Sequence, residues 1–349
     1  MTSRWRRSVA AAQAELGRSV VALAPGAADT DREDGVLRFG VKDTAAIEDG
    51  LRRRLAAEPG LGWLTVDRAA PGGRAVDTGL TNPLTGRPMT GSTSGGPVNI
   101  LLGLIDFCVG TDGGGSVLGP ALATGLAGVI GAGMGLVSSV ERVSTDGYPF
   151  RPSLGVIGRD WPTARAGLAA LLRAAGVAPP PAADLAGVRV AVPRPGSVTL
   201  PDGADMAAEL APWLAPLWAA GAVAVEVDMS GIATRDRSLD LLRRLWDSAD
   251  LAVTLEGPVD LYGLGDSVVG VLGRPGAQLQ ALGGKYLLRS VNLAGCTGVA
   301  LPVPRLASGL VLAGPPGAAG AGRTLAAADL LAPSLRMPPV FGRYFFQLP

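Results

Sequence analysis

Two short segments of the chain place serine and threonine hydroxyls among glycines, at a density that suits neither a core strand nor a helix. They are Gly91-Ser-Thr-Ser-Gly-Gly96 and Gly110-Thr-Asp-Gly-Gly-Gly-Ser116. Successive small residues let backbone N–H groups converge on one point, which is the arrangement that holds a developing oxyanion. A serine at the end of such a run, here Ser116, can attack a carbonyl whose oxygen the same loop binds. The pattern therefore indicates nucleophilic chemistry at a carbonyl group.

The composition restricts which side chain can activate such a serine. The 349 residues include no histidine, which excludes an imidazole base and a Ser-His-Asp triad. Only Lys42 and Lys285 are lysines among the 31 basic residues. A buried lysine can be a neutral base whereas arginine keeps its proton, and Ser-Lys pairs are an attested alternative to the triad. We predict Lys42 as the general base, and we expect Lys285 at the surface or a pocket rim without a role.

Other kinds of site find little support in the sequence. Without histidine, the two cysteines, Cys108 and Cys296, are too few for a zinc site, and we expect both to be buried thiols in a reducing compartment. The segment Gly284-Lys285-Tyr286 lacks the hydroxyl that ends a phosphate-binding loop, and Gly131–Leu136 lacks the last glycine of a dinucleotide fingerprint. We expect no metal and no cofactor.

Charge and hydropathy exclude two classes of partner. The formal net charge is +1, 17% of the residues are charged, and no basic stripe is present, so we expect no nucleic-acid partner. No segment has the ~18 uninterrupted apolar residues of a membrane helix, and polar residues interrupt the one leader-like N-terminal run. We therefore expect a cytoplasmic protein that acts on a small molecule, either alone or as a homodimer.

Strands and helices alternate along much of the chain. Residues 36–41 and 63–66 predict strands, and the first of them ends next to Lys42. Residues 103–132, which surround Ser116, are apolar on almost every side and are typical of elements at the centre of a layered fold. We also predict strands at 188–192, 223–227, 251–255, 298–303 and 310–313, helices at 45–57, 161–175, 204–220 and 324–331, and an irregular stretch at 257–284.

This alternation predicts an α/β layered sandwich. Residues 1–25 predict a helix and residues 29–34 a solvated loop, so we treat 1–35 as an N-terminal segment. No linker or internal repeat divides the remainder, and we expect 36–349 to form a single domain.

The hydroxyl- and glycine-rich segments resemble the signature stretch of the amidase signature family. The resemblance continues in the family's order on both sides and covers roughly residues 36–335. The matching segments are Gly40–Asp43, Thr81–Pro83, Gly91–Gly96, Gly110–Pro120, Gly125–Ser139, Val143–Gly147, Leu154–Arg159, Val291–Gly295, Leu301–Val303 and Gly309–Gly314. The resemblance implies a mixed β-sheet between helical layers, an α/β/α sandwich.

Carried over residue by residue, the resemblance also implies a catalytic mechanism. Ser116 takes the place of the nucleophile and Lys42 that of the base. Thr93 takes the place of the serine that relays the proton between them, and Ser94 is an alternative relay. The backbone N–H groups of Gly113, Gly114, Gly115 and Ser116 would form the oxyanion hole, and the Ser92–Thr93 peptide bond would be cis.

The sequence departs from the family pattern in several places. Thr93 stands where the family has serine, and Leu118 where it has arginine. The stretch between Lys42 and Asn82 is short, and so is 230–285, where the family builds much of its acyl pocket. We therefore regard the chain as a divergent and shortened relative.

These observations predict an amide-bond hydrolase of small linear amides that works through an acyl-enzyme. One alternative is a non-catalytic scaffold or binding subunit, favoured by Leu118 and the short segments. The other is an acyl-transfer or cyclising enzyme of specialised metabolism.

Overall fold

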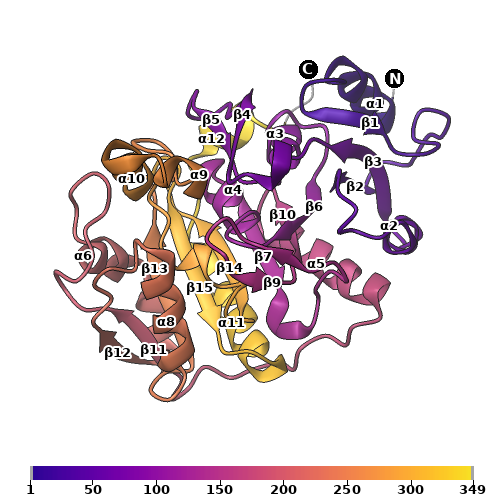
Figure 1. Cartoon of the computed structure of the whole chain (residues 1–349). Helices are drawn as coiled ribbons and strands as arrows, with labels where there is room; N and C mark the ends of the chain where they lie inside the picture. The colour runs from indigo at the N-terminus through magenta and orange to yellow at the C-terminus, as the bar shows by residue number, and fades with distance from the viewer. Residues whose placement is uncertain (1–2, 347–349) are drawn as a thin grey trace.

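A single mixed sheet runs through the molecule, from β1 at one edge to β12 at the other (Figure 1). The computed structural model describes residues 3–346, and within them the sheet has eleven strands in the order β1-β3-β2-β6-β10-β7-β14-β15-β13-β11-β12. β2 is parallel to β3 and β6, the strands from β6 through β10, β7, β14 and β15 to β13 pair antiparallel, and β11 is parallel to both β13 and β12. The strands are β1 (Val20–Leu23), β2 (Leu37–Lys42), β3 (Leu61–Asp67), β6 (Phe107–Asp112), β7 (Ala127–Gly131), β10 (Ser153–Gly158), β11 (Arg189–Pro193), β12 (Val223–Val227), β13 (Leu251–Glu256), β14 (Thr297–Pro302) and β15 (Gly309–Gly314).

Helices cover both faces of this sheet, as predicted for an α/β/α sandwich. Gly96 of α3 packs against Cys108 of β6, whereas Gly167 of α5 packs against Phe107. Consecutive residues of a strand point to opposite faces, so α3 and α5 lie on opposite sides of the sheet. The helices are α1 (Arg4–Ala14), α2 (Asp49–Ala56), α3 (Gly95–Leu101), α4 (Leu118–Ala123), α5 (Trp161–Ala175), α6 (Met206–Leu210), α7 (Ala215–Ala219), α8 (Arg235–Leu245), α9 (Ser267–Gly270), α10 (Gly273–Ala281), α11 (Ala318–Leu331) and α12 (Pro339–Tyr344).

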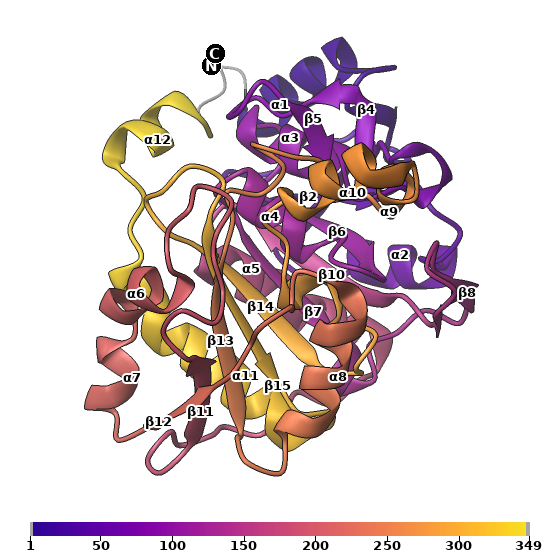
Figure 2. The same cartoon turned by 60° about the vertical axis from the view of Figure 1, so that its left-hand side comes forward.

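The central strands are the most deeply buried elements. Every residue of β6, β7 and β10 is buried, which confirms the prediction that the apolar stretch 103–132 lies at the centre of the fold. Two short hairpins lie outside the large sheet. They are β4 (Val76–Thr81) with β5 (Pro88–Thr90), and β8 (Arg142–Val143) with β9 (Pro149–Phe150), which projects at the right of Figure 2.

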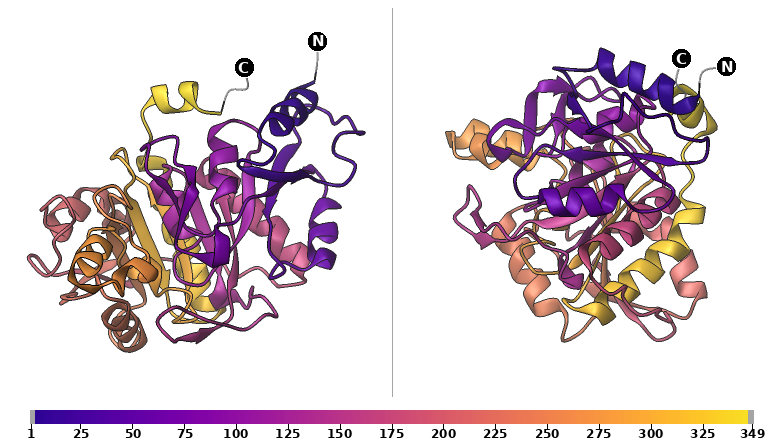
Figure 3. Two further views of the ribbon diagram at one scale, coloured as in Figure 1. Left: turned by 45° about the horizontal axis from the view of Figure 1, so that its top comes forward. Right: turned by 90° about the vertical axis from the view of Figure 1, so that its right-hand side faces the viewer.

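The N-terminal segment is part of the same body, contrary to the expected boundary after residue 35. The predicted helix over 1–25 ends at Ala14, and the chain then enters the sheet as β1, which pairs with β3. Both views of Figure 3 show this indigo segment against the purple strands. Helix propensity was outweighed here because residues 20–23 pair with an otherwise open sheet edge.

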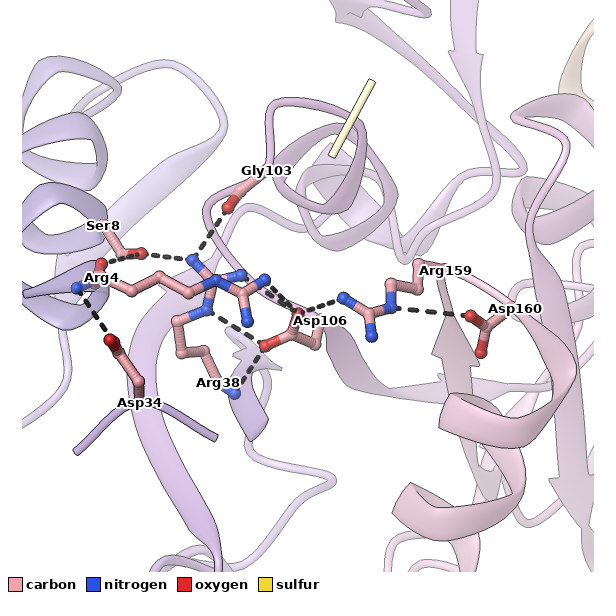
Figure 4. Close-up of polar contacts among 8 residues, drawn as sticks. All are labelled: Arg4, Ser8, Asp34, Arg38, Gly103, Asp106, Arg159 and Asp160. Carbon is pink, nitrogen blue, oxygen red and sulfur yellow. Dashed lines mark hydrogen bonds and ion pairs between the residues drawn. The ribbon is translucent and has the colours of Figure 1, made fainter. Parts of the chain in front are cut away.

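A buried charge network also ties α1 to the sheet (Figure 4). The Asp106 carboxylate accepts hydrogen bonds from the guanidinium groups of Arg4, Arg38 and Arg159, each at 3.0 Å. Arg38 also donates to the hydroxyl of Ser8 on α1. Asp106 is 1% exposed, so the loss of these partners would leave a buried charge unpaired.

Proline and packing explain the other departures from the predicted elements. The predicted helix over 204–220 is broken into α6, a 3-10 turn and α7, since Pro212 and Pro216 each lack the N–H that a helix interior needs. The stretch 257–284, expected to be irregular, contains α9 and α10. The helix predicted at 161–175 and the strand predicted at 223–227 have the predicted bounds.

Across residues 3–346, no helix is long and apolar enough to cross a membrane.

Candidate active site

The predicted base and nucleophile meet at one edge of the sheet. Lys42 is the last residue of β2, and β2 runs parallel to β6, which ends at Asp112. Because parallel neighbouring strands end at the same edge, Lys42 lies beside the loop that follows β6 and carries Ser116. The turn between β5 and α3 brings Ser92 to the same place.

Lys42 is buried among hydroxyl groups. Its side-chain nitrogen, Nζ, donates hydrogen bonds to Ser92 Oγ at 2.7 Å and to Thr111 Oγ1 at 2.9 Å, and the residue is 4% exposed. No carboxylate of the described residues forms an ion pair with it. Burial lowers the pKa of Lys42 to about 7, although the neighbouring Asp112 favours the charged form. A large fraction of Lys42 is therefore the free amine near neutral pH, as a general base requires.

Ser92, rather than either residue predicted as the relay, connects Lys42 with the loop that carries Ser116. Besides meeting Lys42 through its hydroxyl, Ser92 donates its backbone N–H to Ser116 Oγ at 3.4 Å. The hydroxyl of Thr93 instead faces the Thr111 carbonyl oxygen at 3.5 Å, and Thr93 packs against Gly110. Ser94 donates to Asp77 Oδ2 at 2.8 Å. Neither Thr93 nor Ser94 contacts Lys42, so the hydroxyl one residue earlier takes the position predicted for them.

The peptide bond expected to be cis is not cis in this structure. In residues 3–346 the one cis peptide bond is Gly257–Pro258, and the Ser92–Thr93 bond is trans. The Ser92 hydroxyl reaches Lys42 with ordinary peptide geometry.

The Asp112 carboxylate shapes the loop that carries Ser116. It accepts backbone hydrogen bonds from Gly115 at 2.7 Å, Val117 at 2.6 Å and Leu118 at 3.3 Å. Gly115 has φ +94°, and a Cβ there would lie 2.3 Å from Leu288 Cδ1, so only glycine fits at this position. The resulting turn leaves Ser116 half-buried at the wall of a cavity.

Part of the predicted oxyanion hole is available in this geometry. Gly113, Gly114 and Ser116 line the cavity, and none of the described residues accepts a hydrogen bond from their backbone N–H groups. The N–H of Gly115, which was predicted to contribute, is bound to Asp112. The available donors are therefore those of Gly113, Gly114 and Ser116, and Gly115 serves to form the turn.

The cavity beside Ser116 has a volume of about 520 Å³. Its walls include Lys42, Ser92 and Thr111, together with residues of the β8–β9 hairpin and of α8. A larger cavity of about 700 Å³ lies against α12. It contains none of the predicted site residues, so we place the chemistry in the smaller one.

Lys285 is buried, although we expected it at the surface or at a pocket rim. Its Nζ lies 2.6 Å from Asp260 Oδ2, and the two side chains are 4% and 1% exposed. Asp260 also accepts hydrogen bonds from Thr90 Oγ1 at 2.7 Å and from the N–H of Gly265 at 2.7 Å. Lys285 is thus the cation of a buried ion pair that holds the chain after β13 against β5.

The two cysteines are free and buried, as predicted. Burial raises the pKa of Cys296 to about 12 and holds that of Cys108 well above its ordinary value. Neither thiol is therefore an activated nucleophile. Within the part of the chain that the structure describes, no group of three or more cysteine, aspartate and glutamate side chains is placed to hold a metal ion.

Of these groups, the sequence pointed to Lys42 and Ser116 but not to Ser92 or Thr111 as partners of Lys42. Ser92, Thr93 and Ser94 are consecutive hydroxyl residues, and the sequence contains no signal that distinguishes them. Thr111 lies next to the last residue of β6, and β6 is parallel to β2, which ends at Lys42. This position at the end of a neighbouring parallel strand is the signal that could have identified Thr111 as a partner of Lys42.

No protein-family model matches the chain, and no curated protein matches it in sequence. Solved structures match it over nearly the whole length of both chains. The 6-aminohexanoate cyclic dimer hydrolase complexed with substrate superimposes with a TM-score of 0.67 at 15% identity, covering 97% of this chain and 95% of that one. A glutamyl-tRNA(Gln) amidotransferase subunit from Thermotoga maritima gives a TM-score of 0.64 at 14% identity, covering 99% and 94%.

A bacterial aryl acylamidase belonging to the amidase signature enzymes gives a TM-score of 0.63 at 15% identity, with coverage of 94% and 93%. This chain therefore has the amidase signature fold, which confirms the fold that the resemblance implied.

Proposed function

We propose that this protein is a hydrolase of small-molecule amides, with Ser116 as nucleophile, Ser92 as proton relay and Lys42 as general base. The observation that carries the proposal is the environment of Lys42, whose buried nitrogen contacts two hydroxyls and no carboxylate beside a serine loop with free N–H groups. Solved structures with this fold include a cyclic dimer hydrolase and an aryl acylamidase, whose names support amide chemistry at this site.

In the first half of the reaction, Ser116 Oγ attacks the amide carbonyl carbon. The Ser116 proton passes to Ser92 Oγ, and the proton of Ser92 passes to the free amine of Lys42, which becomes an ammonium. This transfer needs the lone pair of Lys42 to face Ser92, while a Lys42 N–H donates to Thr111. The negative carbonyl oxygen is held by the N–H groups of Gly113, Gly114 and Ser116.

Collapse of this intermediate breaks the C–N bond, and the Lys42 proton returns through Ser92 to the departing amine or ammonia. Ser116 is left as an acyl ester. In the second half, a water molecule attacks the ester carbonyl and gives its proton to Lys42 by the same route. The carboxylic acid leaves, and Ser116 recovers its proton from Lys42.

The size of the cavity, about 520 Å³, suits a small molecule and favours a small amide as substrate. Two free thiols with no disulfide among the described residues favour a reducing compartment, and we propose the cytoplasm.

Labelling with a fluorophosphonate probe tests the nucleophile directly. We expect mass spectrometry to show one adduct on Ser116 of the wild-type protein, and no adduct on a folded Ser116→Ala variant. Ser139→Ala removes an exposed serine that hydrogen-bonds Glu48 and is the matched control, which should label like the wild type. Failure of the folded wild-type protein to label would favour the non-catalytic scaffold. Transfer of the acyl group to an added amine in preference to water would favour the acyl-transfer alternative.

A further inference from the structure

The guanidinium of Arg235 lies beside the loop that supplies the proposed oxyanion hole. Arg235 is the first residue of α8 and lines the cavity of Ser116. A Cβ added to Gly114 would lie 3.0 Å from Arg235 Nη2, so this nitrogen reaches the backbone that would bind the carbonyl oxygen of the substrate. The α8 helix and the β8–β9 hairpin, which close this side of the cavity, are seen in Figure 2.

Only part of this guanidinium is paired. Nη1 forms an ion pair with Asp146 in the loop between β8 and β9. Nε is buried without a hydrogen-bond partner, and no described residue accepts a hydrogen bond from Nη2. The Arg235 side chain is 9% exposed. A buried guanidinium with unsatisfied donors is costly unless another group satisfies them, and Nη2, which lies beside Gly114 at the cavity, is the donor placed to bind such a group.

Neighbouring residues add further positive charge. Arg289 is 5% exposed and donates to the Ala233 carbonyl oxygen at 2.7 Å, and among the described residues no carboxylate forms an ion pair with it. Burial and the charge of Arg235 lower the pKa of Arg289 to about 10. Arg142, on the β8–β9 hairpin, also lines the cavity, with no ion pair to any residue in 3–346. Of Arg235, Arg289 and Arg142, only Arg235 forms an ion pair with a described residue, Asp146.

Arg74 also lines the cavity, but unlike Arg142 it has a carboxylate partner. It pairs with Asp266 at 3.1 Å, and both residues line the cavity, so their charges offset each other. Asp43, which also lines the cavity, follows Lys42 at the end of β2, so Arg235 and Arg142 are the lining arginines whose charge no lining carboxylate pairs with.

We propose that Arg235 binds a carboxylate of the substrate, so that this site prefers amides that carry a carboxylate within a few atoms of the scissile carbonyl. Nη2 has two N–H donors, and a carboxylate oxygen that accepts from it forms a charge-assisted hydrogen bond with the guanidinium. This inference rests on the proposed amide hydrolysis and specifies its substrate class. The nearby Arg142 adds attraction for the same charge.

The experiment compares a charged and a neutral amide of similar size. Succinamate carries the carboxylate on the acyl part, N-acetylglycine carries it on the amine part, and butyramide carries none. We expect the wild-type protein to hydrolyse one of the two carboxylates with a kcat/KM at least about tenfold above that for butyramide. Arg235→Gln should reduce this ratio by about 10- to 100-fold, because charge-assisted hydrogen bonds to the carboxylate are lost.

Two controls keep the result interpretable. Arg237→Gln removes an exposed arginine from the same helix and should leave the ratio unchanged. Should Arg235→Gln fail to fold, Asp146→Asn tests the same site by removing the ion-pair partner of Arg235. It frees Nη1 and should maintain or raise the preference for the carboxylate.

A binding measurement separates this inference from the proposed function. Ser116→Ala protein, titrated with succinamate and N-acetylglycine by calorimetry, should bind one of them, and Ser116→Ala/Arg235→Gln should bind it at least about tenfold more weakly. Hydrolysis of butyramide with no preference for either carboxylate would overturn the inference and leave the hydrolase intact. Binding of a carboxylate through Arg235 without hydrolysis of any amide would overturn the hydrolase and retain the anion site.

Discussion

The two lysines of this chain occupy two equally buried regions with opposite surroundings. Lys42 and Lys285 are 4% and 6% exposed. Lys285 has the carboxylate of Asp260 at 2.6 Å, whereas Lys42 has the hydroxyls of Ser92 and Thr111 at 2.7 and 2.9 Å. Burial alone does not therefore distinguish the two lysines. The two lysines differ in the group that contacts the buried side-chain nitrogen, which is a carboxylate for Lys285 and two hydroxyls for Lys42.

A carboxylate partner holds a lysine in an ion pair, whereas hydroxyl partners can serve either the ammonium or the free amine. The region around Lys285 gains a fixed ion pair from this, and the region around Lys42 gains a group that can take up and release a proton. The proposed mechanism requires a lysine rather than an arginine at position 42, since arginine would stay charged there.

Substitution of Lys42 should have the largest effect on activity. We expect Lys42→Ala and Lys42→Arg each to lower kcat/KM for a hydrolysed amide by at least about 1,000-fold, because neither residue can accept the proton. Circular dichroism and the rate of fluorophosphonate labelling check folding and nucleophile activation. Lys285→Arg, which keeps the charge of the ion pair, is the matched control and should retain activity. A Lys42→Arg variant with near-normal activity would contradict the general-base role.

Removal of the relay hydroxyl should have the next largest effect. We expect Ser92→Ala to lower kcat/KM by about 100- to 10,000-fold, the range for a group that transfers protons in the transition state. Thr93→Val keeps the shape of a fully buried residue and removes the hydroxyl first predicted as the relay, and it should change kcat/KM by less than about threefold. The reverse result would restore Thr93 as the relay.

Loss of the buried Lys285–Asp260 ion pair should lower the stability of the protein. Lys285→Met leaves Asp260 as an unpaired buried charge, and we expect it to lower the free energy of unfolding by about 3–5 kcal/mol, measured by urea denaturation. The double variant Lys285→Met/Asp260→Asn removes both charges and should be more stable than the single variant. Equal stability of the two variants would show that the pair is not coupled.

Sequence reasoning predicted residues that the structure brings together, but not all of their contacts. The absence of histidine and the scarcity of lysine predicted Lys42 as the base, and the run of glycines predicted Ser116 as the nucleophile and included Gly113 and Gly114, whose N–H groups have no acceptor among the described residues. Both arguments depend on residue type, which the sequence states directly. The alternation of strands and helices gave the layered fold for a similar reason, since hydrophobic periodicity is local.

The failures concern directions of side chains, which depend on packing between distant segments. Ser92 was passed over because three consecutive hydroxyls differ only in where the turn points each of them. Gly115 was assigned to the oxyanion hole because the sequence does not show that Asp112 captures its N–H. Lys285 was placed near the surface because its partner Asp260 lies on a segment whose path the sequence left irregular.

The pH dependence of the reaction should show the smallest effect, and it reports on Lys42 itself. Burial lowers the pKa of Lys42 to about 7, Asp112 opposes this, and the positive charge of Arg142 lowers it further. In the proposed mechanism the free amine is the active form, so kcat/KM should fall about tenfold per pH unit below 7 and reach a plateau above it.

Arg142→Gln removes one of the charges that disfavour the ammonium, so the midpoint of this profile should move to higher pH. Because Arg142 is exposed, added salt should screen its charge and shift the wild-type midpoint in the same direction. Lys285→Arg, the control from the other region, should leave the midpoint unchanged. A profile that is flat between pH 6 and 8 would contradict the titration of Lys42 in this range. A midpoint that moves equally in Arg142→Gln and Lys285→Arg would show that the titrating group is not Lys42, and the functional contrast between the two lysines would be lost.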